Sequence, residues 1–277
     1  VTKEERVHKG HGTTSAIDQR WTFDHSGRNT AHFLNLNQAG EIQLSALEYT
    51  VKDQLKKKQL GYTGNGFLQS LDYTYLENGF LKRINEFDLA GTGGDPDDLF
   101  YLELGYDSPT FSSATDAYNG NISDTHWRIK GSLAKAYRYE YDYLNRLTSA
   151  DYGAYSTSSQ GSLSYTGDYD TQYNYDARGN ITYLYRKGMK SDGQGGFSPG
   201  LIDQMLYSYP TGSNQLTSIN DIAPSGFKEL GFHTNGHSGN YDYDVNGNLA
   251  IDPAKQLSIT DKYLKLPQEL NKTGGGK

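Results

Sequence analysis

A short pattern recurs along this chain: an aromatic residue, any residue, a second aromatic residue, Asp, two residues, Gly or Asn, one residue, and an aliphatic residue. The clearest copies run from Tyr173 to Ile181, from Tyr241 to Leu249 and from Tyr139 to Leu147. Weaker copies run from Trp21 to Arg28 and from Tyr73 to Leu81, and degenerate ones lie around Tyr49 to Leu55, Tyr207 to Leu216 and Ile259 to Leu266. Recurrence of one short unit predicts a repeat architecture, in which each unit packs on its neighbours.

Each copy predicts a small β-hairpin. The two aromatic residues alternate along a strand, so both rings lie on one face. The Asp starts a turn and accepts hydrogen bonds from backbone N–H groups two residues on. Gly, or Asn, then occupies a position that requires positive φ. The predicted turn residues are Asp24, Gly27, Gly79, Asp142, Asn145, Asp176, Gly179, Asp244 and Gly247, and the repeat aromatics are Trp21, Phe23, Tyr73, Tyr75, Tyr139, Tyr141, Tyr173, Tyr175, Tyr241 and Tyr243.

We therefore predict an all-β fold of successive antiparallel hairpins in one long, twisted or curled sheet. No composition shift marks a boundary, so residues 1–277 are interpreted as a single repeat region. Loops of variable length are expected between hairpins, at residues 91–98, 156–162, 191–200 and 222–226. Asp53 and Leu76 depart from the pattern, since Gly and Asp are expected there, and these two hairpins are the least secure.

The composition fits a sheet whose two faces are both partly exposed to solvent. The chain has 24 Tyr but only 10 Phe and 2 Trp, so much of the packing must come from rings that carry a hydroxyl. The net charge of −7 argues against a nucleic-acid partner. The one basic run, Lys56–Lys58, is interpreted as a solvated strand edge. There are no cysteines and no apolar run long enough to cross a membrane as a helix.

Three groups of side chains could be read as metal sites, and each has a simpler explanation. Asp242, Asp244 and Asn246 open like a calcium loop, but the twelfth position holds Pro253 where a bidentate Glu is required. The cluster Asp95, Asp97 and Asp98 is typical of a solvated acidic loop. The histidines at 8, 11, 25 and 32 lack the context of a zinc site. We expect no metal and no cofactor.

Catalytic motifs are missing from the sequence. There is no nucleophile elbow, no phosphate-binding loop and no glycine-rich dinucleotide motif. Paired carboxylates that converge only in space stay open as an alternative, although turn formation explains the many Asp residues better. The interpretation is that the chain is not an enzyme.

The repeats resemble the tyrosine-aspartate (YD) repeats of the RHS family, which includes polymorphic-toxin shells, toxin-complex C components and teneurins. The segments Asp98–Asp107, Tyr118–Trp127 and Tyr141–Tyr152 are especially similar to RHS proteins of the Bacteroidetes group. The resemblance runs from about Trp21 to Leu270. It implies a β-spiral cocoon that encloses a C-terminal toxin. Some shells of this family end in a self-cleaving aspartyl segment, but Asp95-Pro96 and Asp252-Pro253 lack its context.

The expected function is structural: a shell or scaffold segment of an exported protein that encloses or presents another polypeptide. The resemblance implies a secreted or cell-surface location and partners in the rest of the same polypeptide: further repeats and toxin cargo. Contact with outer-membrane secretion machinery is also expected. Val1 and the glycine-rich end look like the edges of a fragment, with any export signal outside it. The alternative is a surface adhesin or glycan-binding module that uses exposed tyrosines.

Overall fold

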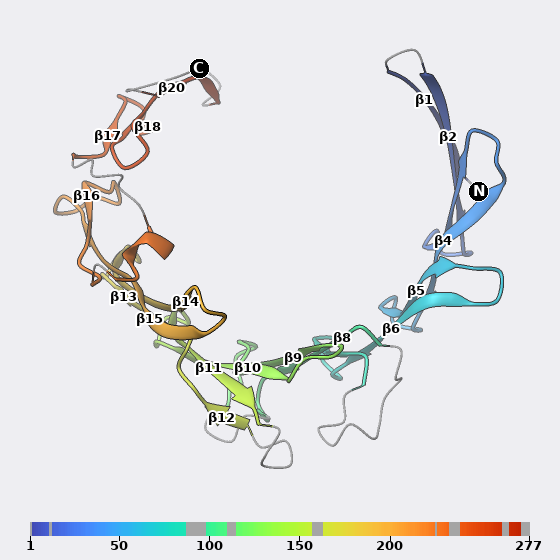
Figure 1. The fold of residues 1–277 in the computed structure, drawn as a ribbon, viewed down its shortest axis with the longest axis horizontal. Helices are drawn as coiled ribbons and strands as arrows, with labels where there is room; N and C mark the ends of the chain where they lie inside the picture. The colour runs from blue at the N-terminus through green and yellow to red at the C-terminus, as the bar shows by residue number, and fades with distance from the viewer. Residues whose placement is uncertain are drawn as a thin grey trace. The chain divides into compact units, whose positions relative to one another are not determined.

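The structure, a computed structural model, describes residues 2–10, 13–86, 98–109, 115–156, 163–224, 226–232, 239–261 and 266–272. Among these residues nearly all regular structure is antiparallel β-strand, and the single helical element is a short 3-10 turn (Figure 1). The predicted all-β class is therefore confirmed. No helix in these ranges is long and apolar enough to cross a membrane.

The chain divides into two compact units. The first comprises residues 1–112, 116–136 and 154–163, and the second comprises residues 113–115, 137–153 and 164–277. The boundary falls within two strands, because β10 (Lys135–Tyr141) and β11 (Leu147–Tyr155) each contribute residues to both units.

In the first unit, each strand pairs with the next strand along the chain. The strands are β1 (Thr2–Gly10), β2 (Thr13–Phe23), β3 (Asn29–Leu36), β4 (Glu41–Tyr49), β5 (Leu55–Tyr62), β6 (Phe67–Tyr75), β7 (Leu81–Ile84), β8 (Phe100–Gly105) and β9 (Asp124–Ile129). This meander of neighbouring hairpins is the arrangement that short repeats with local turns dictate.

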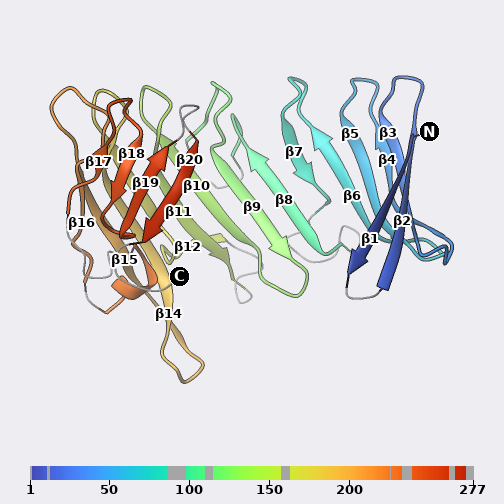
Figure 2. The same cartoon turned by 90° about the horizontal axis from the view of Figure 1, so that it is seen from above.

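The second unit continues the same plan. It contains β12 (Leu163–Tyr165, shared at its first residue), β13 (Thr171–Tyr175), β14 (Ile181–Ser191), β15 (Phe197–Ser208), β16 (Ser218–Asp221), η1 (Lys228–Leu230), β17 (Asp242–Tyr243), β18 (Leu249–Asp252), β19 (Leu257–Asp261) and β20 (Pro267–Lys272). The pairing order is β11-β13-β14-β15-β16, and β12 adds to β11. In Figure 2 the β14–β15 hairpin projects beyond its neighbours.

The described strands form a 16-stranded and a 4-stranded sheet, where a single sheet was expected. The break lies between β16 and β17. Strand β17 is only two residues long. One backbone hydrogen bond still joins the two sheets there, from the Tyr241 N–H to the Thr217 carbonyl at 2.9 Å. The succession of hairpins therefore continues from β16 to β17, although the pairing between them is too short for the two sheets to count as one.

Two local expectations were wrong. The Lys56–Lys58 run lies in β5, which pairs with β4 on one side and β6 on the other, so it is not a sheet edge. Lys57 faces Glu48 and Asp72 across the two ladders, and these carboxylates offset its charge. The loop expected at 191–200 is shorter than predicted, because a tight turn at 192–196 lets β15 begin at Phe197.

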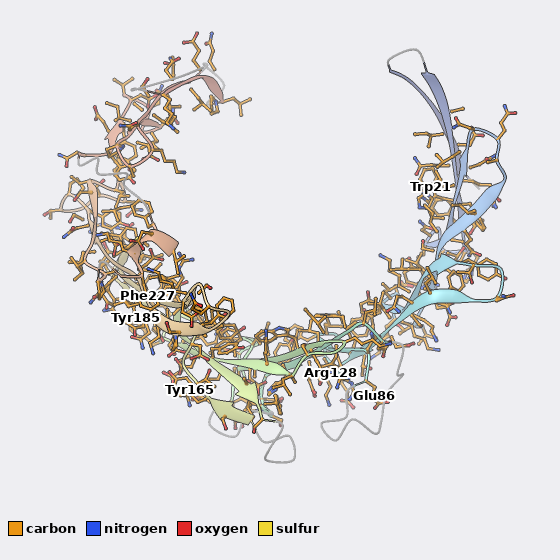
Figure 3. The ribbon with its side chains drawn as sticks, viewed as in Figure 1. Trp21, Glu86, Arg128, Tyr165, Tyr185 and Phe227 are labelled. Carbon is orange, nitrogen blue, oxygen red and sulfur yellow. The ribbon has the colours of Figure 1, made fainter. Side chains whose placement is uncertain are left out.

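The core is thin. Only five large apolar or aromatic side chains are buried among the described residues: Tyr101, Tyr152, Tyr155, Ile202 and Met205. The other buried apolar positions are alanines, whereas many large apolar side chains, such as Phe197 and Leu68, are exposed. Side chains stand on both faces of the strands (Figure 3). Hairpin-to-hairpin hydrogen bonds and ring contacts must therefore contribute much of the cohesion.

Candidate functional site: a ladder of turns between hairpins

The repeat turn has one geometry, which Asp176 illustrates. Its Oδ1 accepts the N–H groups of Arg178 at 2.8 Å and Asn180 at 2.9 Å, and its Oδ2 accepts the Asn180 side-chain amide at 2.8 Å. The Asp176 N–H donates to the Asn180 carbonyl at 2.9 Å. The turn therefore closes through both the backbone and one carboxylate. The carboxylates of Asp24, Asp142 and Asp244 make the same set of contacts.

These contacts set the electrostatics of the turn. Burial by itself would raise the pKa of Asp176, but the hydrogen bonds from Asn180 and Arg178 outweigh it and lower the pKa. The pKa values of Asp24 and Asp142 are lowered in the same way, against burial, by hydrogen bonds from Arg28 and Arg146. At Asp244 the backbone hydrogen bond from Asn248 is the largest influence and lowers the pKa. Each turn thus favours a charged carboxylate.

The fourth turn position adopts positive φ in the three clear copies and the two weaker ones. The values are 79° at Gly27, 92° at Gly79, 61° at Asn145, 89° at Gly179 and 83° at Gly247. A register shift adjoins the second aromatic of most copies, which is the bulge that a type I turn followed by a left-handed residue produces.

The two departures from the pattern form the turn as well. Asp53 takes the glycine position with φ of 63°, and the Thr50 hydroxyl replaces the missing carboxylate by accepting the N–H groups of Lys52 and Gln54, both at 3.2 Å. At Leu76 the backbone closes the turn, with its N–H donating to the Phe80 carbonyl at 2.8 Å, and the Asn78 side chain accepts the Phe80 N–H at 3.0 Å. Turn geometry is therefore kept where the sequence motif is not.

Six tyrosine hydroxyls each tie a hairpin to the preceding one. In five of the six, the hydroxyl donates to the carbonyl of the first residue of the preceding return strand, whereas the acceptor of Tyr243 lies two residues before β16. In the first unit the pairs are Tyr49 with Asn29, Tyr75 with Leu55 and Tyr106 with Leu81; in the second unit they are Tyr175 with Leu147, Tyr209 with Ile181 and Tyr243 with Leu216, all at 2.8–3.1 Å. The link requires the tyrosine hydroxyl, so the copy with Phe23 at this position cannot make it.

The last residue of the turn reaches toward the next turn. Arg146 donates to the Asp176 carbonyl at 2.9 Å, and Asn180 donates to the Ser213 carbonyl at 3.1 Å. Gln54 does the same to Gly79 at 3.2 Å. The Arg146 guanidinium also lies over the Tyr175 ring, 4.6 Å from its centroid. Backward and forward contacts together make a ladder along the row of turns, which we call the turn ladder.

Several of the predicted aromatics pack on neighbouring rings. Trp21 stacks on His32 with centroids 4.8 Å apart, and its position on β2 is marked in Figure 3. Tyr173 and Tyr175 stack at 6.4 Å, and Tyr139 stacks on Tyr137 at 6.1 Å. Phe23 is 42% exposed. Burial raises the pKa values of the repeat tyrosines Tyr73, Tyr75, Tyr141 and Tyr175, and raises that of Tyr241 to about 12.

The structure brings no metal-binding group together in the part of the chain that it describes. Both carboxylate oxygens of Asp244, the central residue of the calcium-like stretch, accept hydrogen bonds within its own turn. Asp95 and Asp97, and the side chains of His8 and His11, lie outside the described residues, as does Pro96.

Sequence analysis missed a second set of Asx residues, at the opposite ends of the strands. Asn37, Asn85, Asp170 and Asp221 accept the N–H of a residue on an adjacent strand, at 2.8–3.0 Å. Asn37 and Asn85 also donate their own N–H to the carbonyl of that same residue. No local motif surrounds these positions, so only strand pairing reveals them.

A buried polar trio in the first unit was also missed. His126 is 2% exposed, with Nε2 3.0 Å from the Asp124 carboxylate and Nδ1 2.9 Å from the Tyr155 hydroxyl. Gly105 leaves the room that Asp124 occupies, because a Cβ there would overlap the carboxylate. Burial, followed by the charges of Asp124 and Glu103, raises the pKa of Tyr155 to about 12. Because these three side chains are enclosed, their role is in the packing of the first unit.

No family model matches the sequence, and no curated protein matches it either. Among solved structures, the chain is similar to the crystal structure of TcdB2-TccC3-TEV, with 16% identity over 89% of this chain and a TM-score of 0.50. It also matches TcdB2-TccC3-Cdc42, with 19% identity over 89% and a TM-score of 0.48, and the Photorhabdus luminescens Tc holotoxin pore, with 18% identity over 91% and a TM-score of 0.47. The first of these shows that the fold is shared. This chain spans 12%, 11% and 12% of the respective matched chains.

Proposed function

We propose that this chain is a wall segment of an RHS-type repeat protein, which encloses or presents another polypeptide. The turn ladder is the observation that carries the proposal. It ties hairpin to hairpin through hydroxyl–carbonyl and side-chain–carbonyl bonds, and needs no thick core. A single layer built in this way is suited to forming a wall, because each added hairpin supplies its own link to the one before.

The exposed faces indicate what such a wall is for. Large apolar side chains remain exposed on the described strands, among them Leu68 at 66% and Phe197 at 66%. Exposed apolar side chains of this kind are available for contact with another polypeptide, although single ones are common on protein surfaces. We expect that polypeptide to be the remainder of the same chain, with a C-terminal toxin as the cargo. The fold shared with TcdB2-TccC3-TEV supports a repeat wall and leaves the cargo as part of the proposal.

The role proposed here is structural, and the protein that carries it is exported. The proposed location is secreted or on a bacterial cell surface, reached through outer-membrane secretion machinery of the Bacteroidetes type. Fractionation of cells that make the full-length protein would test this. An exported or surface-bound fraction is expected, and retention of all the protein in the cytoplasm would contradict it.

The contacts of the tyrosines favour the wall function over the alternative function, a surface adhesin that binds glycans with exposed tyrosine rings. The hydroxyls of six of them are engaged by backbone carbonyls in the turn ladder, and Tyr173 and Tyr175 stack on each other. A tyrosine whose hydroxyl already donates to a backbone carbonyl cannot donate that proton to a glycan. Glycan recognition by these repeat tyrosines is therefore the weaker candidate.

Protease protection tests enclosure directly. The full-length polypeptide would be digested under native conditions, alongside its C-terminal remainder expressed alone. If the repeats enclose the remainder, it stays intact in the full-length protein and is cleaved when alone. Equal cleavage rates in the two samples would refute enclosure.

A further inference from the structure

A pocket of about 370 Å³ lies in the second unit, where the 16-stranded sheet meets the 4-stranded sheet. Its walls come from β16, η1, the segment before β17 and the end of β18. The lining residues that matter chemically are Asp221, Lys228, Phe232, Asn240, Tyr241 and Pro253. The volume is at the lower end of the range for small-molecule sites.

Asp221 brings an unsatisfied oxygen to this pocket. Its Oδ1 accepts the N–H groups of Gln204 and Ala223, both at 3.0 Å. Its Oδ2 is buried and has no hydrogen-bond partner, and the side chain is only 1% exposed. A buried carboxylate oxygen without a donor is costly, so a donor supplied by a ligand would be strongly favoured.

Lys228 covers that oxygen without saturating it. Its Nζ is 3.6 Å from Oδ2, beyond hydrogen-bond distance, and donates instead to the Asp221 backbone carbonyl at 2.5 Å. The Lys228 side chain is 42% exposed and flexible, so a small group can displace the ammonium outward. The site holds one negative and one positive charge side by side, which disfavours ligands with a strong charge of either sign.

We propose that this pocket binds a monosaccharide unit, through a hydroxyl placed between Asp221 and Lys228. A hydroxyl can donate to Oδ2 and accept from Nζ at the same time, which neither a carboxylate nor an ammonium ligand can do. The Asn240 amide supplies a further polar group at the rim. Phe232, Tyr241 and Pro253 supply apolar walls for the C–H faces of the ring. The site is separate from the turn ladder and goes beyond the proposed wall role.

The test uses the full-length protein and four sugars: glucose, galactose, mannose and N-acetylglucosamine. Saturation-transfer NMR detects binding, and calorimetry gives the affinity. At least one sugar should bind, and Asp221→Asn should weaken its affinity at least tenfold. Asparagine keeps an oxygen for Gln204 and Ala223 but places a donor where the ligand needs an acceptor, so the fold should survive.

Asp170→Asn is the matched control, because Asp170 also accepts a strand N–H, that of Tyr152, but does not line the pocket. It should leave sugar affinity unchanged. Asn240→Ala changes an exposed side chain, so it should weaken binding even if Asp221→Asn fails to fold. Binding of no sugar, or equal affinity of the wild-type protein and both pocket variants, would overturn the proposal. Neither result would bear on enclosure of cargo.

Discussion

Replacing Tyr175 by phenylalanine removes one rung of the turn ladder and little else. The ring remains, and with it the stacking on Tyr173 and the contact with Arg146. What is lost is the hydroxyl that donates to the Leu147 carbonyl at 2.8 Å. A net intramolecular hydrogen bond contributes about 1 kcal/mol, and the carbonyl left behind is only partly rescued by water. The link between these two hairpins should weaken by about that amount.

The effect should be local, since each repeat contacts mainly its neighbours. A loss of about 1 kcal/mol raises the population of the locally opened state about fivefold. Hydrogen–deuterium exchange of the full-length protein should therefore show about fivefold faster exchange in peptides from β11 and β13. Peptides from distant hairpins should exchange as in the wild-type protein.

Tyr173→Phe is the matched control. Tyr173 lies two residues away in the same strand and on the same face, but its hydroxyl makes no hydrogen bond within the described residues. The control should exchange almost as the wild-type protein does. If both variants exchange equally fast, or if neither differs from the wild-type protein, the hydroxyl bonds do not hold the hairpins together and the reasoning is refuted.

Three further predictions concern the core and the turns. Gly105→Ala should cost about 3 kcal/mol, since its Cβ would overlap the Asp124 carboxylate, whereas Gly226→Ala meets nothing within 4 Å and should be close to neutral in denaturant titrations. His126→Leu should cost about 2–3 kcal/mol by the same assay, because it takes the imidazole away from two buried polar partners; a cost below about 0.5 kcal/mol would contradict this. The lowered pKa of Asp176 means that its contribution to stability is fully present above the ordinary pKa of 3.8 and is lost as the pH falls through the folded-state pKa. Asp176→Asn cannot titrate, so its stability should fall less between neutral and acidic pH; identical pH profiles would count against this role.

The hairpins could be predicted from sequence because their causes are local. Asp176, Gly179 and the two tyrosines before them lie within seven residues, and turn chemistry and strand alternation act over that distance. Thr50 shows the limit of a motif, because its hydroxyl can replace the Asp carboxylate while the sequence pattern appears broken.

Long-range partners could not be predicted in this way. Tyr175 bonds Leu147, 28 residues earlier, while Tyr75 bonds Leu55, only 20 residues earlier. Variable loops change the spacing, so no fixed period indicates the acceptor. The Lys56–Lys58 run was misread for the same reason, since a strand's two neighbours are not visible in its own residues.

The environments of Asp221 and His126 depend on tertiary structure still more, so they are even harder to predict from the sequence. An isolated Asp in a repeat rich in Asp looks like a turn residue, and only burial shows that one of its oxygens lacks a donor. His126 belongs to no repeat, and its two partners come from one nearby residue and one 29 residues away.

The central claim is that the repeats form a wall around another polypeptide. Single-particle electron microscopy of the full-length protein tests it most directly. The account predicts hairpins joined side by side by the turn ladder, with density for the remaining polypeptide enclosed by the wall. Hairpins arranged without the tyrosine–carbonyl links, or a remainder that lies wholly outside the repeats, would contradict it.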